Sequence, residues 1–565
     1  MSDVPAALSL TEWIEYPRAD RGVRFRGADG RWERLTYVEL AQHARGWAAE
    51  LSRADARADD VVPIVMSTGP EFIAAFYGTL LAGAQPVVLP LPWALSGKAP
   101  YAPYFTDLAT AGAPRIAVAA PEYADEVRRT ASACRDDITV LTRGHSGRAD
   151  SPVAPGKNGL IQFTSGSRGV PRALRVSRKA LEAQVMLLHA VVPDTGWVGV
   201  SWLPMYHDMG LIGNLLLPVS RQAEHALMSP EQFVLDPGAW LSEYGSRPYS
   251  TMTMPNFGFE RVCRYARRMD LEGLDFSSVR MIITGAERVD PDVLARFSAL
   301  LEPHGFDCSS VAPAYGMAET TLAVTCGTPP STPATLVRIP AGARAMGGRV
   351  PVGDSRPLSS AAVEEPWLWH TSCGPALRGV TVDIVDREGA SLPENTLGEI
   401  RVGSPSLAES YTAGDVGGPS RLEKDALYTG DAGFLREGEL FVVGRLADAL
   451  RLEHGTVFME DVEIGLAWRL GVGPRRVVAV ANDEEEPVVL VLTTFDPVPG
   501  MAVIQEFVES FTRGRARIEV MWVGRGGIPM TTSGKPRRAT VWDLHRKGEL
   551  RQVASHSLEG GAAGE

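Results

Sequence analysis

A glycine-rich stretch after an apolar run has the residue types that bind an anion. The apolar run 159–163 is typical of a strand end, and the glycines that follow permit turns that a Cβ would forbid. Such a turn can direct backbone N–H groups toward a phosphate, while hydroxyls and a guanidinium add donors. By itself a Ser/Gly turn is most often only a turn, and no Gly-Lys-Ser/Thr completes a Walker loop here. The candidate phosphate loop consists of Thr164, Ser165, Gly166, Ser167, Arg168 and Gly169.

A His-Asp pair interrupts the apolar stretch 202–211. His207 and Asp208 stand between Met205 and Met209-Gly210, and polar groups in such surroundings usually need partners. Taken alone, the pair is more typical of a satisfied core histidine than of a binding site. Hydrophobic residues nearby could line a pocket for an apolar substrate or could equally belong to the core. These residues are Met205, Met209, Leu211, Ile212 and Phe257.

Two other stretches combine a turn with an acid. The apolar run 282–283 leads through Thr284 into Gly285, Ala286 and Glu287, and the run 311–314 leads into an aromatic, a turn glycine and an acid. An aromatic face can pack on a nucleobase, and a carboxylate can hold a magnesium ion beside phosphates. Either stretch could also be structural. The second one contributes Tyr315, Gly316, Met317 and Glu319.

Three charged residues in the last third of the chain could complete a nucleotide site. Asp431, which we place at a strand-end turn, can accept hydrogen bonds from two ribose hydroxyls, and Arg445 can donate to the sugar or a phosphate. Lys535 follows a Ser-Gly turn in the stretch 528–535. Alone, each would be most simply explained as a turn aspartate, a surface arginine or a loop lysine.

Composition narrows the class of protein. The chain has 565 residues, which predicts two to four folded units. Its 56 basic and 68 acidic residues give a net charge of −12, which argues against general nucleic-acid binding but not against a small anion in a local basic loop.

Cysteine usage and the apolar stretches predict a cytoplasmic protein. The five cysteines are dispersed and form no CxxC, so we expect free, buried thiols. The N-terminus lacks the pattern of a signal peptide. The longest apolar stretch, 72–95, contains three prolines and predicts a helix followed by a buried strand, not a membrane insertion.

The pattern of elements predicts an α/β protein with a large N-terminal body and a smaller C-terminal unit. Residues 1–150 and 160–325 alternate apolar strands with amphipathic helices, as in a largely parallel covered sheet. Thr36 and Glu39 have capping-box spacing and predict a helix to about Ser52. Residues 326–372, the inserted segment, predict a surface segment or a small irregular subdomain. Short strands from 380 predict a small β subdomain, and a mobile α+β C-terminal domain is expected over 446–565 after an adenylate-binding domain over 1–445.

In their order along nearly the whole chain, these motifs resemble the superfamily of adenylate-forming enzymes, which includes acyl-CoA synthetases and fatty acyl-AMP ligases. The fatty acyl-AMP ligases are the most similar branch, and they also carry an insertion where this chain has the inserted segment. The motifs that carry the resemblance are SWLPMYHDMGLIG at 201–213, ITGAE at 283–287, AYGMAETTL at 314–322, SCG at 372–374 and LYTGDAGFL at 427–435.

The resemblance implies a role for each candidate residue. The loop 164–169 would close over the phosphates, and residues 285–287 would lie along the adenine with Tyr315 on its face. Glu319 would hold magnesium, Asp431 would bind the ribose, and Arg445 would sit near a hinge at Ala447. Lys535 would enter from the C-terminal domain to stabilise the adenylation transition state. The substrate-binding residues would be His207, Asp208, Met209, Gly210 and Phe257.

Three positions depart from the family pattern. Arg168 replaces a small hydroxyl residue, Arg172-Ala173 replaces Lys-Gly, and Ala447 replaces an Asp or Lys at the hinge. Arg168 could hold a pyrophosphate or fill the space of the β- and γ-phosphates. An acyl adenylate lacks those two phosphates and would still fit. We therefore predict that adenylate binding survives while adenylation from ATP is weak or lost.

The resemblance implies an acid–thiol ligase that handles a hydrophobic carboxylic acid as its acyl-AMP. CoA is the expected acceptor because no carrier domain is fused to this chain, and the expected ligands are ATP or acyl-AMP, Mg²⁺ and CoA. Two alternatives remain open. The inserted segment favours a fatty acyl-AMP ligase that loads an acyl carrier protein, whereas Arg168 and Ala447 favour a non-catalytic adenylate-binding protein.

Overall fold

Strand β3 (Val61–Val65) explains why the first part of the chain folds as a covered sheet. In the computed structural model all five residues are buried, and their side chains alternate between two hydrophobic clusters. Val62 and Ile64 pack with helices α2 (Tyr37–Arg53) and α3 (Pro70–Leu81), whereas Val61 and Val65 pack with α4 (Ala102–Gly112) and α5 (Ala124–Ala131). A strand buried on both faces is the pattern of a parallel sheet with helices on each side.

The first sheet has seven strands in the order β20-β8-β7-β4-β3-β5-β6. As expected, five of these strands, β7, β4, β3, β5 and β6, run parallel. Strand β8 is antiparallel to β7, and β20 is antiparallel to β8. The Thr36–Glu39 capping box that starts α2 is confirmed. The remaining strands of this sheet are β4 (Gln85–Val88), β5 (Ile116–Ala119), β6 (Thr139–Leu141), β7 (Asn158–Thr164), β8 (Arg172–Ser177) and β20 (Ser410–Tyr411).

The structure describes most, but not all, of the residues of the chain. The described residues are 9–94, 101–132, 137–144, 158–164, 171–266, 269–328, 333–342, 344–414, 420–473, 475–482, 486–531 and 534–558.

Two four-stranded sheets form the second part of the body, in the orders β2-β1-β10-β9 and β11-β12-β13-β14. Their strands are β1 (Gly22–Arg26), β2 (Trp32–Thr36), β9 (Trp197–Ser201), β10 (Glu224–Leu227), β11 (Thr251–Thr253), β12 (Met281–Thr284), β13 (Val311–Gly316) and β14 (Ala323–Cys326). The helices around them and at the N-terminus are α1 (Glu12–Glu15), α6 (Arg178–Val191), α7 (Leu217–Ser220), α8 (Pro230–Leu235), α9 (Pro237–Gly245), α10 (Asn256–Ala266) and α11 (Pro291–Leu301).

The two α/β parts interleave, which the expected division near residue 150 did not allow for. Strands β1 and β2 pair with β10 of the second part, and β7 and β8 add to β4 of the first part. The periodicity of a strand indicates that it is buried but not which sheet it joins, so the division along the sequence was wrong in this respect.

The predicted β subdomain is present as a five-stranded antiparallel sheet in the order β18-β19-β22-β21, with β23 beside β22. Its strands are β18 (Thr381–Val385), β19 (Gly398–Gly403), β21 (Arg421–Leu422), β22 (Leu427–Arg436) and β23 (Glu439–Arg445). Asp431 lies inside β22, opposite Arg445, and the expectation of a strand-end turn at Asp431 was wrong. A bulge after Ala432 lets the hairpin continue past Gly430 and Gly433 without ending.

The inserted segment is more ordered than its composition predicted. Strands β15 (Thr335–Arg338), β16 (Ser355–Pro357) and β17 (Trp369–Thr371) form an antiparallel sheet in the order β16-β15-β17. Val337, Trp367 and His370 are buried, so the segment is a small subdomain and not a surface loop.

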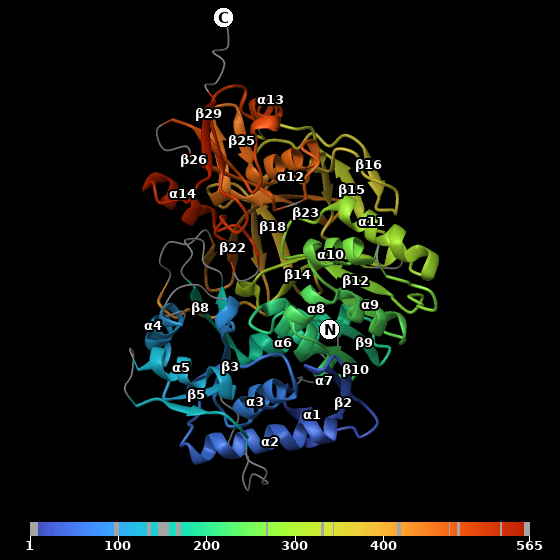
Figure 1. Ribbon diagram of the computed structural model, residues 1–565, viewed down its shortest axis with the longest axis vertical. Helices are drawn as coiled ribbons and strands as arrows, with labels where there is room; N and C mark the ends of the chain where they lie inside the picture. The colour runs from blue at the N-terminus through green and yellow to red at the C-terminus, as the bar shows by residue number, and fades with distance from the viewer. Residues whose placement is uncertain are drawn as a thin grey trace, which may run out of the picture.

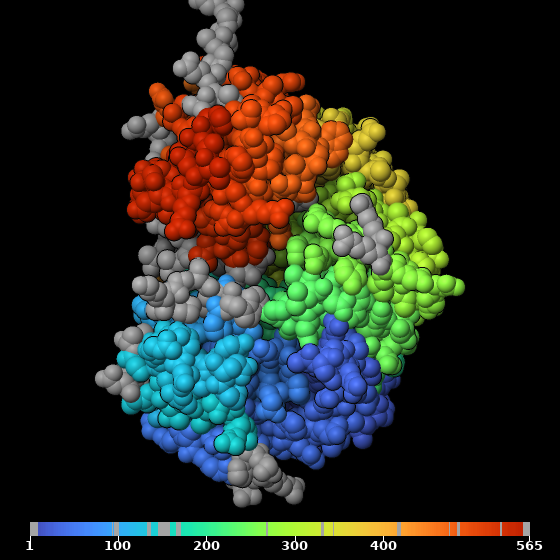
Figure 2. Space-filling model, in the orientation of Figure 1, coloured from blue at the N-terminus to red at the C-terminus, as the bar shows by residue number. Residues whose placement is uncertain are grey.

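The elements after Arg445 form the C-terminal unit, defined here as residues 446–558, which covers the end of the molecule opposite α1 and α2 (Figures 1 and 2). It contains the hairpin β24 (Ala449–Leu452) and β25 (Gly455–Phe458), the sheet β26 (Val477–Asn482), β27 (Val488–Thr493), β28 (Arg517–Trp522) and β29 (Ala554–Leu558), and helices α12 (Met459–Arg469), α13 (Met501–Thr512) and α14 (Arg538–Arg546).

The inserted segment connects the body to helix α12. Asp461, only 1% exposed, pairs with Arg288 of the body and with Arg344 of the inserted segment, the latter at 2.5 Å. Backbone hydrogen bonds join Arg344 to Thr456 of β25 in both directions. Trp367 packs against Trp468 and Phe507 of the C-terminal unit, with ring centroids 5.2 and 5.5 Å away.

None of the helices within the described ranges combines the length and apolar character that a membrane span requires. Within the same ranges, the cysteines are free, and Cys326 and Cys373 are buried as expected while Cys263 and Cys308 are half-buried.

Candidate active site

The loops after two neighbouring parallel strands form one wall of the candidate site. Strands β12 and β13 pair in register through Thr284 and Pro313, so the residues that follow them leave the same edge of the sheet. Gly285 lies against β13, where a Cβ would overlap the carbonyl oxygen of Ala314. Ala286 then adopts a left-handed φ of +66°. The oxygen Oε1 of Glu287 is buried and receives no hydrogen bond within the described ranges, which leaves an acceptor available to a ligand.

Tyr315, Asp431 and Arg445 come together from two different sheets. The Tyr315 hydroxyl donates to Oδ2 of Asp431 at 2.8 Å, and Nε of Arg445 lies 3.4 Å from Oδ1. The β22–β23 register places Asp431 directly opposite Arg445. Burial raises the pKa of Tyr315 well above its ordinary value, and Asp431 raises it further, so the hydroxyl keeps its proton. The predicted ribose-binding group is thus fixed by a donor on each oxygen.

Glu319 is buried and does not face solvent. It follows β13 in a short 3₁₀ helix, η6 (Ala318–Thr320), and is 6% exposed. Its Oε1 accepts hydrogen bonds from the hydroxyls of Tyr411 and Ser420, the second at 3.1 Å. The guanidinium of Arg172 stacks over the Tyr411 ring at 3.6 Å. Arg172, at a position that departs from the family pattern, therefore packs on Tyr411, which in turn donates a hydrogen bond to Glu319.

The stretch from His207 to Gly210 leads into a π-helix. The Asp208 side chain accepts a hydrogen bond from the Met209 amide at 2.7 Å, at the start of η3 (Met209–Leu216). Gly210 packs against the Pro204 carbonyl, where a Cβ would not fit. Burial raises the pKa of Asp208, Glu319 raises it further, and Lys535 opposes both. Asp208 therefore lies within electrostatic reach of Glu319 and Lys535, although the three are far apart in the sequence.

Lys535 reaches the body from a turn of the C-terminal unit. The Lys535 amide donates to the Thr531 hydroxyl at 3.0 Å, and the Thr531 amide donates to the Lys535 carbonyl at 2.7 Å. Burial lowers the pKa of Lys535 and Arg445 lowers it further, whereas Glu287, Asp208 and Asp431 raise it. Four charged residues of the body thus act on one lysine of the C-terminal unit.

The remaining predicted residues lie around this group or outside the described ranges. Phe257, at the start of α10, contacts Trp202 edge to face with centroids 6.3 Å apart. Ala447 lies exposed in the 3₁₀ turn η8 (Leu446–Asp448), which joins β23 to β24. Thr164 ends β7, with its hydroxyl 3.5 Å from the Arg172 carbonyl. Ser165, Gly166, Ser167, Arg168 and Gly169 lie outside the described residues.

Comparison with known proteins shows the family of this chain. The family model for AMP-binding enzymes matches residues 13–99 and 109–412. The chain belongs to the AMP-binding enzyme family. A Mycobacterium tuberculosis protein named a fatty-acid–CoA ligase is 29% identical over 98% of this chain and 100% of its own length. The 4-hydroxyphenylalkanoate adenylyltransferase of Mycobacterium marinum is 30% identical over 92% of this chain and 87% of its own.

Solved structures of AMP-binding enzymes confirm the fold. A fatty acyl-adenylate ligase from a study of the Escherichia coli and Legionella pneumophila enzymes superposes with a TM-score of 0.80 at 24% identity, covering 96% of this chain and 98% of that one. The L. pneumophila fatty acyl-adenylate ligase in complex with acyl adenylate and pyrophosphate gives 0.68 at 25% identity, covering 98% of both chains. The predicted resemblance, fold class and enzyme class are confirmed.

The carboxylate of Glu319 suits the magnesium ion that this family of enzymes implies. Within the described ranges no three His, Cys, Asp or Glu side chains are grouped to hold a metal ion by themselves. Mg²⁺ commonly takes one or two protein carboxylates together with phosphates of the substrate. A single buried carboxylate, oriented by two hydroxyls on one oxygen, fits an ion that arrives with the nucleotide.

Sequence reasoning missed several residues of the site. Tyr411 and Ser420 hold Glu319, yet a lone aromatic and a serine in an irregular stretch carry no local signal of that role. Arg475 precedes β26, which starts at Val477, and it contacts Glu287 and Phe257, a role for which the local sequence gives no signal.

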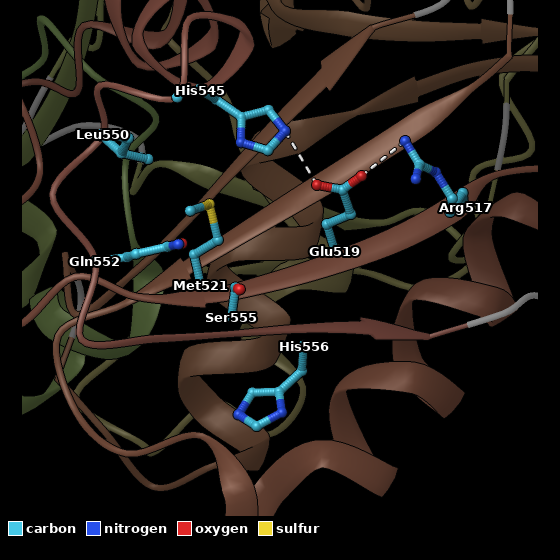
Figure 3. A pocket seen from close by; sticks show the side chains of 9 residues that line it. Arg517, Glu519, Met521, His545, Leu550, Gln552, Ser555 and His556 are labelled. Atoms are coloured by element: carbon cyan, nitrogen blue, oxygen red, sulfur yellow. Dashed lines mark ion pairs between the residues drawn. The ribbon is translucent and has the colours of Figure 1, made fainter.

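One cavity of the C-terminal unit is separate from this site. It measures about 330 Å³ and lies beside β28, β29 and α14 (Figure 3). His545 and Arg517 both point to Glu519 there, at 3.0 and 2.7 Å. None of the predicted site residues lines it.

Proposed function

We propose that this enzyme handles a hydrophobic carboxylic acid as its acyl adenylate, which it forms only slowly from ATP, with Lys535 as the cation that stabilises the transition state. The observation that carries the proposal is that Arg475 lies against Gly534, next to Lys535, while it pairs with Glu287 of the body. Four charged residues of the body also act on the pKa of Lys535. When a carboxylate attacks the α-phosphorus of ATP, negative charge gathers on the phosphate oxygens. A lysine fixed in a partly buried site offsets that charge more strongly than one in water would.

The proposed nucleotide site uses the wall formed by β12, β13, β22 and β23. Residues Gly285 to Glu287 would lie along the adenine and Tyr315 would pack on its face, and the buried Oε1 of Glu287 leaves an acceptor there. Asp431 would accept the ribose hydroxyls, since Tyr315 and Arg445 already fix its orientation. Glu319 would hold Mg²⁺, which supplies positive charge beside the phosphates.

The proposed acyl side lies between η3 and α10. His207, Asp208, Met209 and Gly210 would border the carboxylate, and Phe257 would contact the apolar chain. Support for a hydrophobic acid comes from the relatives, which are named for fatty acids and for 4-hydroxyphenylalkanoates. Both kinds of acid join a carboxylate to an apolar body.

For the second half-reaction we propose transfer of the acyl group to a thiol, with CoA as the first candidate. The relative named a fatty-acid–CoA ligase supports CoA. The presence of the inserted segment, which the resembling fatty acyl-AMP ligases also carry, supports the second candidate, an acyl carrier protein. Admitting a thiol requires Lys535 to withdraw, and the buried pairs of Asp461 with Arg288 and Arg344 oppose that movement.

One experiment separates the two half-reactions. The full chain is supplied with a series of fatty and aryl acids plus ATP and Mg²⁺, and pyrophosphate release is measured. In parallel, preformed acyl adenylates are supplied with CoA or with a carrier protein, and thioester is measured. Brisk pyrophosphate release would contradict the prediction, drawn from Arg168, that adenylation from ATP is weak. No affinity for acyl adenylates or their stable mimics would overturn the proposed function as a whole.

Lys535→Met tests the role of the lysine directly. We expect the adenylation rate to fall ~100- to 1,000-fold, the range typical of removing one transition-state stabiliser, with little change in affinity for preformed acyl adenylate. Lys547→Met is the matched control, because Lys547 is exposed at the end of α14. Equal losses in both variants, or none in either, would contradict the role given to Lys535.

A further inference from the structure

Arg475 connects the C-terminal unit to both sides of the candidate active site. Its Nη2 lies 3.5 Å from Oε2 of Glu287, on the proposed adenine side. Its guanidinium lies 5.1 Å from the centroid of the Phe257 ring, on the proposed acyl side. Both partners belong to the body, so both contacts join the C-terminal unit to it.

The same guanidinium lies against the turn that carries Lys535. A Cβ on Gly534 would come within 2.9 Å of Nη1 of Arg475, so glycine makes room for the arginine at that point. Gly534 also has a φ of +76°, which favours glycine. Arg475 therefore touches the residue that precedes Lys535 while it contacts the body.

The backbone at Arg475 adopts an uncommon conformation. Its φ is +67°, in the left-handed region that disfavours residues with a side chain other than Asn or Asp. Such a conformation is retained where surrounding contacts determine it, and it is concentrated at functional sites. Here Arg475 precedes β26, and its side chain contacts Glu287 and Phe257 of the body.

Glu287 is shared between the two cations of the C-terminal unit. It pairs with Arg475. It also raises the pKa of Lys535, whereas Arg445 lowers it. The Arg475–Glu287 pair is about one-third and one-quarter exposed, at 32% and 23%. A pair with this exposure is weak enough to break and re-form in each catalytic cycle.

We propose that Arg475 is a positioning residue that sets Lys535 over the active site each time the C-terminal unit closes. The inference rests on the proposed function, because it assigns Arg475 to the adenylation step. On closure Arg475 contacts Glu287 on the proposed adenine side and Phe257 on the proposed acyl side. Its contact with Gly534 then fixes the position of Lys535. It makes no contact with the reacting atoms in this role.

The test compares Arg475 variants with a matched neighbour in the full-length enzyme. Arg475→Ala removes the side chain, and Arg475→Gly removes it while also accepting the left-handed backbone. Arg476→Ala is the control, because Arg476 contacts Thr494 and Phe495 within the C-terminal unit. For each variant, pyrophosphate release from acid plus ATP is measured beside thioester formation from preformed acyl adenylate, and unfolding temperature is recorded.

We expect kcat for adenylation to fall ~10- to 100-fold in both Arg475 variants, as for a misplaced catalytic group, with KM for ATP nearly unchanged. Thioester formation from preformed acyl adenylate should be retained or faster, because the closed state is loosened. Arg475→Lys should restore part of the rate, and Arg476→Ala should behave as wild type.

Three results would overturn the proposal. One is an adenylation rate in Arg475→Gly equal to that of wild type, and another is an equal fall of both half-reactions with a lowered unfolding temperature. The third is an equal loss in Arg476→Ala. If the wild-type enzyme binds acyl adenylates but forms none from any acid, the proposed adenylation step is wrong. This outcome is measured on wild type, without any Arg475 variant.

Discussion

Among the contacts between the C-terminal unit and the body, two begin at adjacent residues, Glu287 and Arg288. Arg288 pairs with Asp461 in a buried cluster, whereas Glu287 pairs with Arg475 in a half-exposed one. Asp461 is 1% exposed and has Arg344 and His370 as further neighbours. The Glu287 contact has one ion pair and one cation–ring contact.

The difference in burial indicates that the two contacts have different roles. Removing one partner of a buried ion pair leaves an uncompensated charge and is strongly destabilising, whereas a half-exposed pair contributes little. The Asp461 cluster therefore determines where the C-terminal unit sits. The Glu287 contact, beside Lys535, adds little to the stability of the closed position and is instead suited to orienting Lys535 there.

Asp461→Asn should produce the largest effect. The change leaves Arg288 and Arg344 buried without their carboxylate, so we expect a loss of about 3–5 kcal/mol in the free energy of unfolding. Urea unfolding at pH 7 and limited proteolysis near α12 measure it. Glu506→Gln, on the exposed face of α13, is the control and should change little.

The effect of Asp461 should also depend on pH. The two arginines outweigh burial and hold the pKa of Asp461 at about 2, below its ordinary value of 3.8. The unfolded chain takes up the proton first as the pH falls, so this stabilisation is present above about pH 4 and is lost toward pH 2. The difference between wild type and Asp461→Asn should shrink over that window. A constant difference down to pH 2.5 would contradict this role.

Glu460 should show the opposite pH dependence although it is the neighbour of Asp461. Its pKa is raised from 4.5 to about 7, chiefly by burial, with Arg538 opposing and with Asp448 and Glu463 adding to the rise. The folded protein then holds a proton that the unfolded chain has lost, so stability falls as the pH rises from 4.5 to 7, by up to about 3 kcal/mol.

Glu460→Gln should remove this loss. We expect the variant to be more stable than wild type at pH 7.5 and similar to it at pH 4.5, as measured by urea unfolding at both values. Glu423→Gln, an exposed acid of the body, is the control. A variant less stable than wild type at pH 7.5 would show that the charged form of Glu460 is stabilising.

Glu287→Gln should give the smallest change in stability, below about 1 kcal/mol, because its pair with Arg475 is partly exposed. Set beside Asp461→Asn, it applies the same acid-to-amide change at the other contact. A loss of stability as large as that of Asp461→Asn would remove the distinction between the two contacts.

Much of the fold could be predicted from local pattern. The capping box of α2, the bounds of α3 and strand β3 follow from hydroxyl–acid spacing, 3.6-residue periodicity and a β-branched apolar run. The residues after β12 and β13 were singled out because an aromatic face can pack on a nucleobase and a carboxylate can hold a magnesium ion. The structure brings Tyr315 and Asp431 together from different sheets.

What could not be predicted depends on pairing between distant segments. The inserted segment has weak periodicity, yet it becomes ordered because Trp367 and Arg344 find partners in the C-terminal unit. Tyr411 reaches Glu319 only because β20 joins β8 across more than two hundred residues. Neither contact leaves a mark in the local sequence.

The interleaving of the two α/β parts has a consequence for synthesis on the ribosome. Strands β1 and β2 must wait for β10, and the first sheet gains its outer strand only when β20 emerges. Until then, unpaired strand edges remain open to other nascent chains. The nascent protein is therefore most vulnerable to aggregation over a long middle interval of translation, and slower elongation there should lower the yield of folded enzyme.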